Sequence, residues 1–169
     1  MQRQKWVDHA FPTNIDVGWT ENILSRVRDT NLRLHHYASI RDDDFNSRKL
    51  EDAWSIKEHI GHLIDLEALH YHRLQQFAAL AHELSPADMS NQRTYAANHN
   101  ERSTKDLLTS FEDKRSQFLI EFDQLNHESL NHAAFHPRLK VEFRPVDMLF
   151  FMAEHDDHHI TSIVELLDR

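Results

Sequence analysis

The sequence predicts an all-α protein that folds as a four-helix bundle with short irregular links. The 169-residue chain contains only two glycines and four prolines, and sheet proteins use many of these residues in their turns. Four long stretches carry apolar residues at three- and four-residue spacing, which is the period of an amphipathic helix. One link, residues 85–102, is long enough to allow a topology other than simple up-down. We therefore expect one bundle domain over residues 1–169.

The first part of the chain predicts an extended arm followed by a helix. Trp6 and Phe11 lie in the arm and are expected to cover an apolar surface. Thr13 and Asp16 have the spacing of a capping box, so the first helix is expected to begin there and to run to about residue 39. The charged residues 41–44 are expected to form a solvated connection.

The second helix has a clear start signal. Ser55 can cap its first turn, and Glu58 can reach back to the Ser55 amide. The helical pattern continues to about residue 82. His62 lies on an apolar side of this helix, near Leu66, so we expect its imidazole to face a packed surface.

The last two helices have equally local signals. Ser103 is expected to cap the third helix, whose apolar side includes Phe111 and Phe118. Residues 141–145 are expected to be extended but too short for a sheet of their own. Pro145 fits the first position of the fourth helix, where its missing N–H costs nothing.

Composition excludes several classes of function. The chain has no cysteine, so disulfides, thiolate ligands and a cysteine nucleophile are excluded. The formal net charge is -9 and no basic block occurs, which predicts no nucleic-acid partner. No signal peptide and no run of about 18 apolar residues is found, so we expect a cytoplasmic protein without membrane contact.

Two of the fifteen histidines lie one turn apart in the last helix. His155 and His159 fall on the same stripe as Met148, Met152 and Ile163, so both are expected to face the core. Histidines at positions i and i+4 can bind one metal ion, because their ring nitrogens converge over a single turn. The alternative is a pair of ordinary hydrogen-bonded core histidines.

A third ligand is needed, and His62 fits the pattern best, with His59 and His70 as rivals. Three imidazoles around one divalent ion leave coordination positions open for water or substrate, as in a catalytic rather than a structural site. The ion then lowers the pKa of a bound water or thiol. Imidazole suits several metals, of which zinc and nickel are favoured.

Other metal motifs match less well. A zincin helix requires a glutamate directly after its first histidine, and Asp156 stands at that position. A di-iron bundle requires two Glu-x-x-His motifs, and only Glu67 with His70 provides one. Near the paired histidines, Asp156 is expected to be solvated and Asp157 to have a partner.

Further expectations concern side chains around the paired histidines and in the links. His158 and Glu154 are expected at the surface. Asn98, His99, His136 and Arg138 lie in links that could form the rim of a pocket.

The chain resembles the DinB-like (YfiT-type) superfamily of four-helix-bundle proteins. The segment Trp-Ser-Ile-Lys-Glu-His-Ile-Gly-His-Leu, residues 54–63, is similar to the tryptophan-led second helix of the family. Residues 154–160, Glu-His-Asp-Asp-His-His-Ile, are similar to the last-helix pair of ligands. The family's metal ligands then fall on His62, His155 and His159. Thr161 and Ser162 depart from the glycine or glutamine that often follows the last ligand.

The resemblance implies one divalent ion per bundle and, often, a homodimer. Characterised members include metal-dependent transferases of low-molecular-weight thiols, so we expect a thiol as co-substrate and a small-molecule electrophile. Arg138 or Arg144 would then contact the anionic groups of the thiol. A hydrolase that uses metal-activated water and a non-enzymatic metal-binding stress protein are the alternatives.

Overall fold

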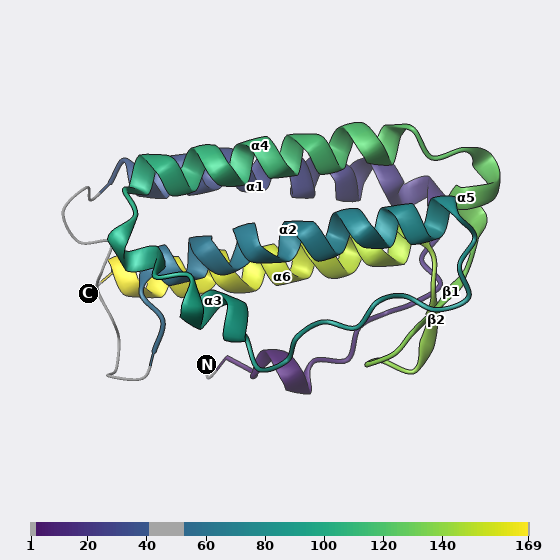
Figure 1. Ribbon diagram of the computed structural model, residues 1–169, viewed down its shortest axis with the longest axis horizontal. Helices are drawn as coiled ribbons and strands as arrows, with labels where there is room; N and C mark the ends of the chain where they lie inside the picture. Colours follow the sequence, from purple (N-terminus) through teal and green to yellow (C-terminus); the bar gives the residue numbers. More distant parts are fainter. Residues whose placement is uncertain (1–2, 41–52, 169) are drawn as a thin grey trace.

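The computed structural model describes residues 3–40 and 53–168, so the connection expected at residues 41–44 lies outside the described residues. Four long helices form the bundle, α1 (Thr20–Ala38), α2 (Ile56–Ala78), α4 (Thr104–Asp123) and α6 (Pro145–Leu167). In Figure 1, α1 and α4 lie above α2 and α6. Both α1 and α2 pack against α4 and α6, so the consecutive helices α1 and α2 lie diagonally opposite each other. This arrangement confirms the predicted four-helix bundle and a topology other than simple up-down.

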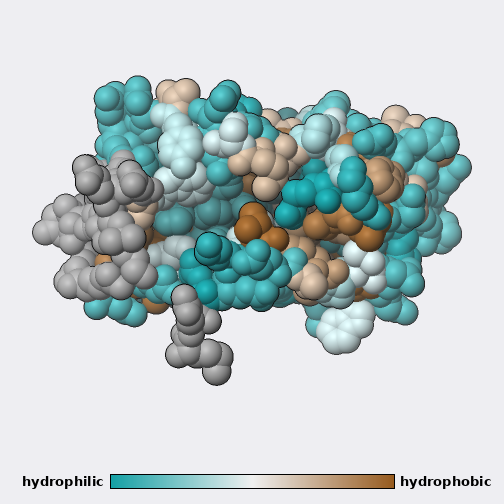
Figure 2. All heavy atoms as spheres, turned by 90° about the horizontal axis from the view of Figure 1, so that it is seen from below, coloured by the Kyte–Doolittle hydropathy of each residue, from teal (hydrophilic) through white to brown (hydrophobic). Residues whose placement is uncertain are grey.

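Short elements connect and flank the long helices. They are the single turns η1 (Trp6–Asp8), η2 (Val17–Trp19) and η3 (His99–Glu101), the short helices α3 (Gln92–Ala96) and α5 (His127–Asn131), and the strands β1 (Ala134–His136) and β2 (Val141–Phe143). The N-terminal arm, α3 and the two strands lie beneath α2 and α6 in Figure 1. Seen from that side, the surface exposes apolar groups between hydrophilic ones (Figure 2). No helix in the described part of the chain is long and apolar enough to cross a membrane.

Local signals placed three helix starts correctly. The Ser55 hydroxyl accepts the Glu58 N–H at 3.1 Å, and the Glu58 carboxylate accepts the Ser55 N–H at 2.7 Å, which completes the capping box. Ser103 accepts the Asp106 N–H at 3.0 Å at the start of α4. Pro145 is the first residue of α6, as predicted.

The predicted start of the first helix was wrong. Asn14 has a φ of 60°, which is incompatible with a right-handed helix. The Asp16 carboxylate instead accepts the Gly18 N–H at 2.7 Å and caps η2. The α-helix therefore begins at Thr20, directly after this turn.

The extended piece expected within residues 141–145 is present, but it pairs with a second short strand, which was not expected. Val141–Phe143 pairs antiparallel with Ala134–His136, and Ala134 lies opposite Phe143. The chain reverses through Lys140, which has a φ of 59° and donates its N–H to the His136 carbonyl at 2.9 Å. Phe143 is buried in the core, which holds the hairpin against the bundle.

A buried ion network joins all four long helices. Arg115 of α4 donates to the Glu67 carboxylate of α2 and to the Asp156 carboxylate of α6, each at 2.7 Å, and to the Val27 carbonyl of α1 at 2.7 Å. The Thr30 hydroxyl donates to Asp156 at 2.7 Å. Burial by itself would raise the pKa of Glu67, but Arg115 and a nearby histidine lower it to about 2.

The network corrects the expectation that Asp156 is solvated, because its side chain is 1% exposed. It separates two apolar clusters along the bundle, one around Phe77 and Met152 and the other around Ile60 and Ile163. It therefore fixes the relative position of α2 and α6, the two helices that carry the predicted ligands.

Candidate metal centre

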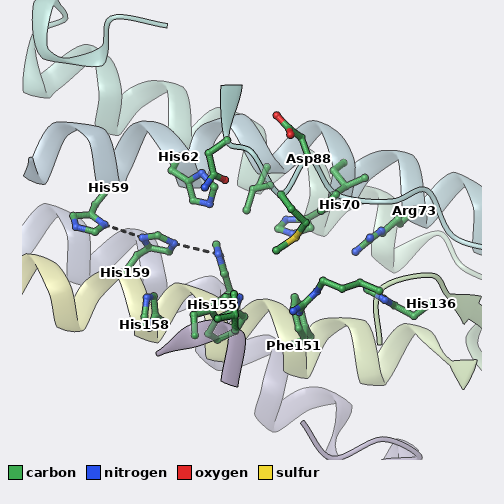
Figure 3. Close-up of a pocket in the computed structure, with 18 of the residues that line it drawn as sticks. His59, His62, His70, Arg73, Asp88, His136, Phe151, His155, His158 and His159 are labelled. Carbon is green, nitrogen blue, oxygen red and sulfur yellow. Dashed lines mark hydrogen bonds between the residues drawn. The ribbon is translucent and has the colours of Figure 1, made fainter. Parts of the chain in front are cut away.

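Three buried histidines from α2 and α6 converge at one point. One ring nitrogen from each of His62, His155 and His159 lies within 4.8 Å of the others. The ring centroid of His62 is 5.3 Å from that of His155 and 4.9 Å from that of His159. The structure thus brings together the three residues that the sequence singled out, as Figure 3 shows.

The geometry of the pair on α6 fits a shared cation. The Nε2 atoms of His155 and His159 are 3.1 Å apart. Two nitrogens bound at 2.0–2.1 Å to one tetrahedral zinc ion would be about 3.3 Å apart. One of these two atoms can carry a hydrogen and donate it to the other, or both can present lone pairs to a shared cation. His155 Nδ1 is buried and has no hydrogen-bond partner among the described residues.

A hydrogen-bonded chain orients His62. Its Nδ1 lies 3.0 Å from the Thr94 hydroxyl, which donates to the Asp65 carboxylate at 3.1 Å. Thr94 therefore accepts the Nδ1 hydrogen of His62, and the Nε2 lone pair is left for a metal. Asp65 also accepts from His99 Nε2 at 2.9 Å. Such outer partners fix the tautomer and ring orientation of a ligating histidine.

The rival ligands occupy supporting positions. His59 Nδ1 lies 2.9 Å from His159 Nδ1, on the opposite side of that ring from Nε2. His70 Nδ1 is 3.6 Å from the Glu67 carboxylate. Since Glu67 belongs to the Arg115 network, the single Glu-x-x-His motif serves the packing of the bundle.

Two tryptophans enclose the triad. Trp54 lies before α2, and its ring centroid is 4.7 Å from that of His62 and 5.9 Å from that of His159. Trp6 of the arm lies 4.9 Å from His155 and 5.4 Å from His158. Trp6 and Phe11 also pack on Phe151, which confirms that the arm covers an apolar surface. The expectation that His158 lies at the surface was wrong, because its side chain is half-buried and lines the space beside Trp6.

Acidic neighbours on α6 bind arginines of α1. Asp157 forms ion pairs with Arg26, at 2.5 Å, and with Arg33. Glu154 pairs with Arg26 at 2.7 Å. The expected partner of Asp157 is therefore present, and neither carboxylate faces the triad as a base.

A cavity of about 310 Å³ opens onto the triad. Its apolar wall includes Leu66, Leu69 and Phe151, and its far end includes Arg73, His136 and Arg138. Figure 3 places His59 and His159 at one end of this space and Arg73 and His136 at the other. Of the four predicted rim residues, His136 and Arg138 line the cavity, whereas Asn98 and His99 do not. His99 is bonded to Asp65, and Arg144, the other arginine expected to contact a thiol, donates to the Ile15 carbonyl.

Burial keeps the triad neutral at physiological pH. Desolvation lowers the pKa of His62 to about 4, and it lowers the pKa of His59 to about 3. Burial, followed by the neighbouring imidazoles, lowers the pKa of His155 and His159 well below the usual range. Neutral imidazole is the form that binds metal.

Comparison with known proteins identifies the family. The family model of the DinB superfamily matches residues 24–163. The chain belongs to the DinB superfamily. No curated protein matches the sequence significantly.

Solved structures show the same fold at low sequence identity. YfiT from Bacillus subtilis, described as a probable metal-dependent hydrolase with an unusual four-helix bundle topology, is 15% identical, with a TM-score of 0.78 over 94% of this chain and 91% of its own. A mycothiol-dependent maleylpyruvate isomerase is 10% identical, with a TM-score of 0.69 over 85% of this chain. The DinB-family chain described here covers 60% of the length of the isomerase.

We predict that Thr94→Val weakens metal binding by about 10- to 100-fold, because it removes both hydrogen bonds that orient His62. The affinity is measured by competition with a chromophoric zinc chelator. Thr109→Val, an exposed position on α4, is the matched control and should leave the affinity unchanged. Equal affinities for the two variants would contradict the role given to Thr94.

The metal-free protein should lose stability as the pH falls. The pKa of His62 is about 4 in the folded protein and about 6.5 in the unfolded chain. Between about pH 4 and pH 6.5 this imidazole therefore binds fewer protons in the folded state than in the unfolded state. The free energy of unfolding therefore falls with pH in that window, by about 1.4 kcal/mol per unit for each such histidine. We expect the Tm from circular dichroism to drop between pH 7 and pH 5, and a constant Tm would argue against buried neutral imidazoles.

Proposed function

We propose that His62, His155 and His159 hold one divalent metal ion and that the protein uses it to transfer a low-molecular-weight thiol to a small electrophile. The observation that carries this proposal is the convergence of three buried acceptor nitrogens at the end of a cavity. Three ligands leave positions open on the ion. When bound, the ion supplies Lewis acidity that lowers the pKa of a thiol or a water. Zinc and nickel both suit imidazole ligands.

The residues around the cavity favour a thiol over water as the nucleophile. A carboxylate beside the metal accelerates hydrolysis by acting as a general base. Asp88 is the one acidic residue among the described residues that line the cavity. Its carboxylate accepts from the Ser90 hydroxyl and the Gln92 amide instead. A thiol needs only a lowered pKa to become nucleophilic. Its sulfur then forms the new bond, its proton passes to water, and the leaving group departs with its electron pair.

The test is a conjugation assay with 1-chloro-2,4-dinitrobenzene and a panel of low-molecular-weight thiols, with zinc or nickel added. We expect a metal-dependent rate above background that is lost in His155→Ala. His72→Ala, an exposed position on α2, is the control and should keep the rate. A background rate with every thiol, from protein shown to contain metal, would overturn the transferase.

A hydrolase is the second candidate, because YfiT is described as a probable metal-dependent hydrolase. A panel of activated esters and amides separates the two reactions. Turnover of an ester that needs metal and His155, without thiol conjugation, would favour hydrolysis.

We also propose that the protein acts as a homodimer, which the family resemblance implies, and that it does so in the cytoplasm, the location expected from its sequence. Light scattering coupled to size exclusion would give twice the chain mass, and a monomer would exclude it.

A further inference from the structure

The end of the cavity opposite the triad is cationic. Arg73 of α2, Arg138 of the β1–β2 link and His136 of β1 line it. Figure 3 shows Arg73 and His136 at this end. Arg73 is 3% exposed. A buried guanidinium is normally paired with an acid, because desolvating an unpaired charge is costly.

Neither arginine has an acidic partner among the described residues. Arg73 donates through Nε and Nη2 to one acceptor, the Ser85 carbonyl, at 3.0 and 2.7 Å. Arg138 lies over the Phe151 ring, 5.4 Å from its centroid. Burial and then the charge of Arg138 lower the pKa of Arg73 to about 10. The two positive charges therefore repel each other, and no acidic group among the described residues pairs with either of them.

His136, beside the two arginines, has a ring N–H without an acceptor among the described residues. His136 Nδ1 accepts the Leu139 N–H at 3.3 Å, so the hydrogen of the neutral ring is on Nε2. This Nε2 is buried and has no hydrogen-bond partner among the described residues. Burial, followed by Arg73 and Arg138, lowers the pKa of His136 to about 4, so the ring stays neutral at pH 7.

The acid nearest in the cavity wall does not neutralise this end. Asp88 is turned toward Ser90 and Gln92, and Figure 3 shows it on the outer side of the cavity. Leu66, Leu69 and Phe151 provide an apolar surface between the cationic end and the triad. The space thus has apolar surface and the ring of His70 in its middle, and donors at the end opposite the triad.

We infer that Arg73, Arg138 and His136 form a carboxylate-binding subsite, and that the substrate is a small acid with an apolar body that lies between this subsite and the triad. A planar carboxylate matches the paired N–H donors of a guanidinium. The apolar wall suits an alkyl or aryl chain. The assignment of this ligand as the substrate rests on the proposed function, whereas its binding to the arginines does not.

The subsite is tested by calorimetric titration of the full-length chain with 3-phenylpropionate and with its uncharged isostere 3-phenylpropanamide. Each is titrated into chelator-treated and zinc-loaded protein. We expect the acid to bind the metal-free protein about tenfold or more tightly than the amide, since hydrogen bonds to a charged group are lost with the amide. Arg73→Gln and Arg138→Gln should each remove about tenfold or more of that preference.

Arg28→Gln, an exposed position on α1, makes the same charge change and should leave the preference intact. Arg73 also donates to the Ser85 carbonyl, so Arg73→Gln could unfold the protein, which a lowered Tm would reveal. In that event the test rests on Arg138→Gln. Equal affinities for acid and amide, or no saturable binding of the acid up to about 10 mM, would overturn the subsite.

The same titrations distinguish a failure of this inference from a failure of the proposed function. If the acid binds only when zinc is present, and binds Arg138→Gln as well as the wild type, its carboxylate lies on the metal. That result would overturn the subsite alone. Binding that depends on both arginines in a protein unable to hold zinc would support the subsite and overturn the metal-dependent reaction.

Discussion

Replacing Arg115 with alanine is expected to lower the free energy of unfolding by about 3–5 kcal/mol, as measured by urea denaturation. The change leaves the buried carboxylates of Glu67 and Asp156 without their cation, and it removes donors to α1, α2 and α6 at once. A loss of this size is a large share of the total stability of a domain. We therefore expect a protein that is largely unfolded near physiological temperature.

Two comparisons make this prediction specific. Arg28→Ala removes an exposed arginine and should change stability by less than about 0.5 kcal/mol. Replacing Arg115, Glu67 and Asp156 together with leucine should recover most of the loss, because no charge is then buried without a partner. If Arg115→Ala behaved like Arg28→Ala, the network would not hold the helices together.

Gly61→Ala is expected to destabilise the protein by about 1–3 kcal/mol through overpacking. A Cβ at this position would lie 2.2 Å from the Cγ and Cδ2 atoms of His99. His99 is 3% exposed and is held by Asp65, so its ring cannot move without breaking that bond. Because Asp65 also accepts from Thr94, we expect metal affinity to fall with stability.

A double-mutant cycle isolates this contact. In a helix without the clash, alanine is favoured over glycine by about 1 kcal/mol. In a His99→Ala background, Gly61→Ala should therefore be neutral or stabilising when urea midpoints are compared. A loss of stability that is the same in both backgrounds would show that His99 is not the cause.

The features predicted correctly from the sequence are those encoded within a few residues. The capping box of Ser55 and Glu58 and the first-turn Pro145 depend on neighbours within one turn, so the helix starts could be predicted. The start of α1 could not, because Asn14 adopts a left-handed conformation that its residue type permits but does not require. The hairpin was missed because its strands, Ala134–His136 and Val141–Phe143, are too short to show an alternating pattern.

The same distinction holds at the site. His155 and His159 were found because they share an apolar stripe one turn apart, and His62 was favoured by its side of α2. Thr94 lies 29 residues from Asp65 and 32 from His62, in a link without periodicity, so its contacts depend on how that link folds back onto α2.

The burial of Asp156 did have a signal in the sequence. Arg115 lies on the same side of its helix as Phe111 and Phe118, and a charged residue on an apolar stripe requires a buried partner. Arg73, which was not singled out, carries a similar signal next to the buried Leu74 and Phe77.

The central claim is that three histidines from α2 and α6 hold one metal ion, and elemental analysis of the zinc-loaded, gel-filtered chain tests it most directly. We expect about one equivalent of zinc per chain in the wild type and in His72→Ala, and less than about 0.1 equivalent in His62→Ala. Less than about 0.1 equivalent in the folded wild type, or undiminished zinc in His62→Ala, would contradict the account.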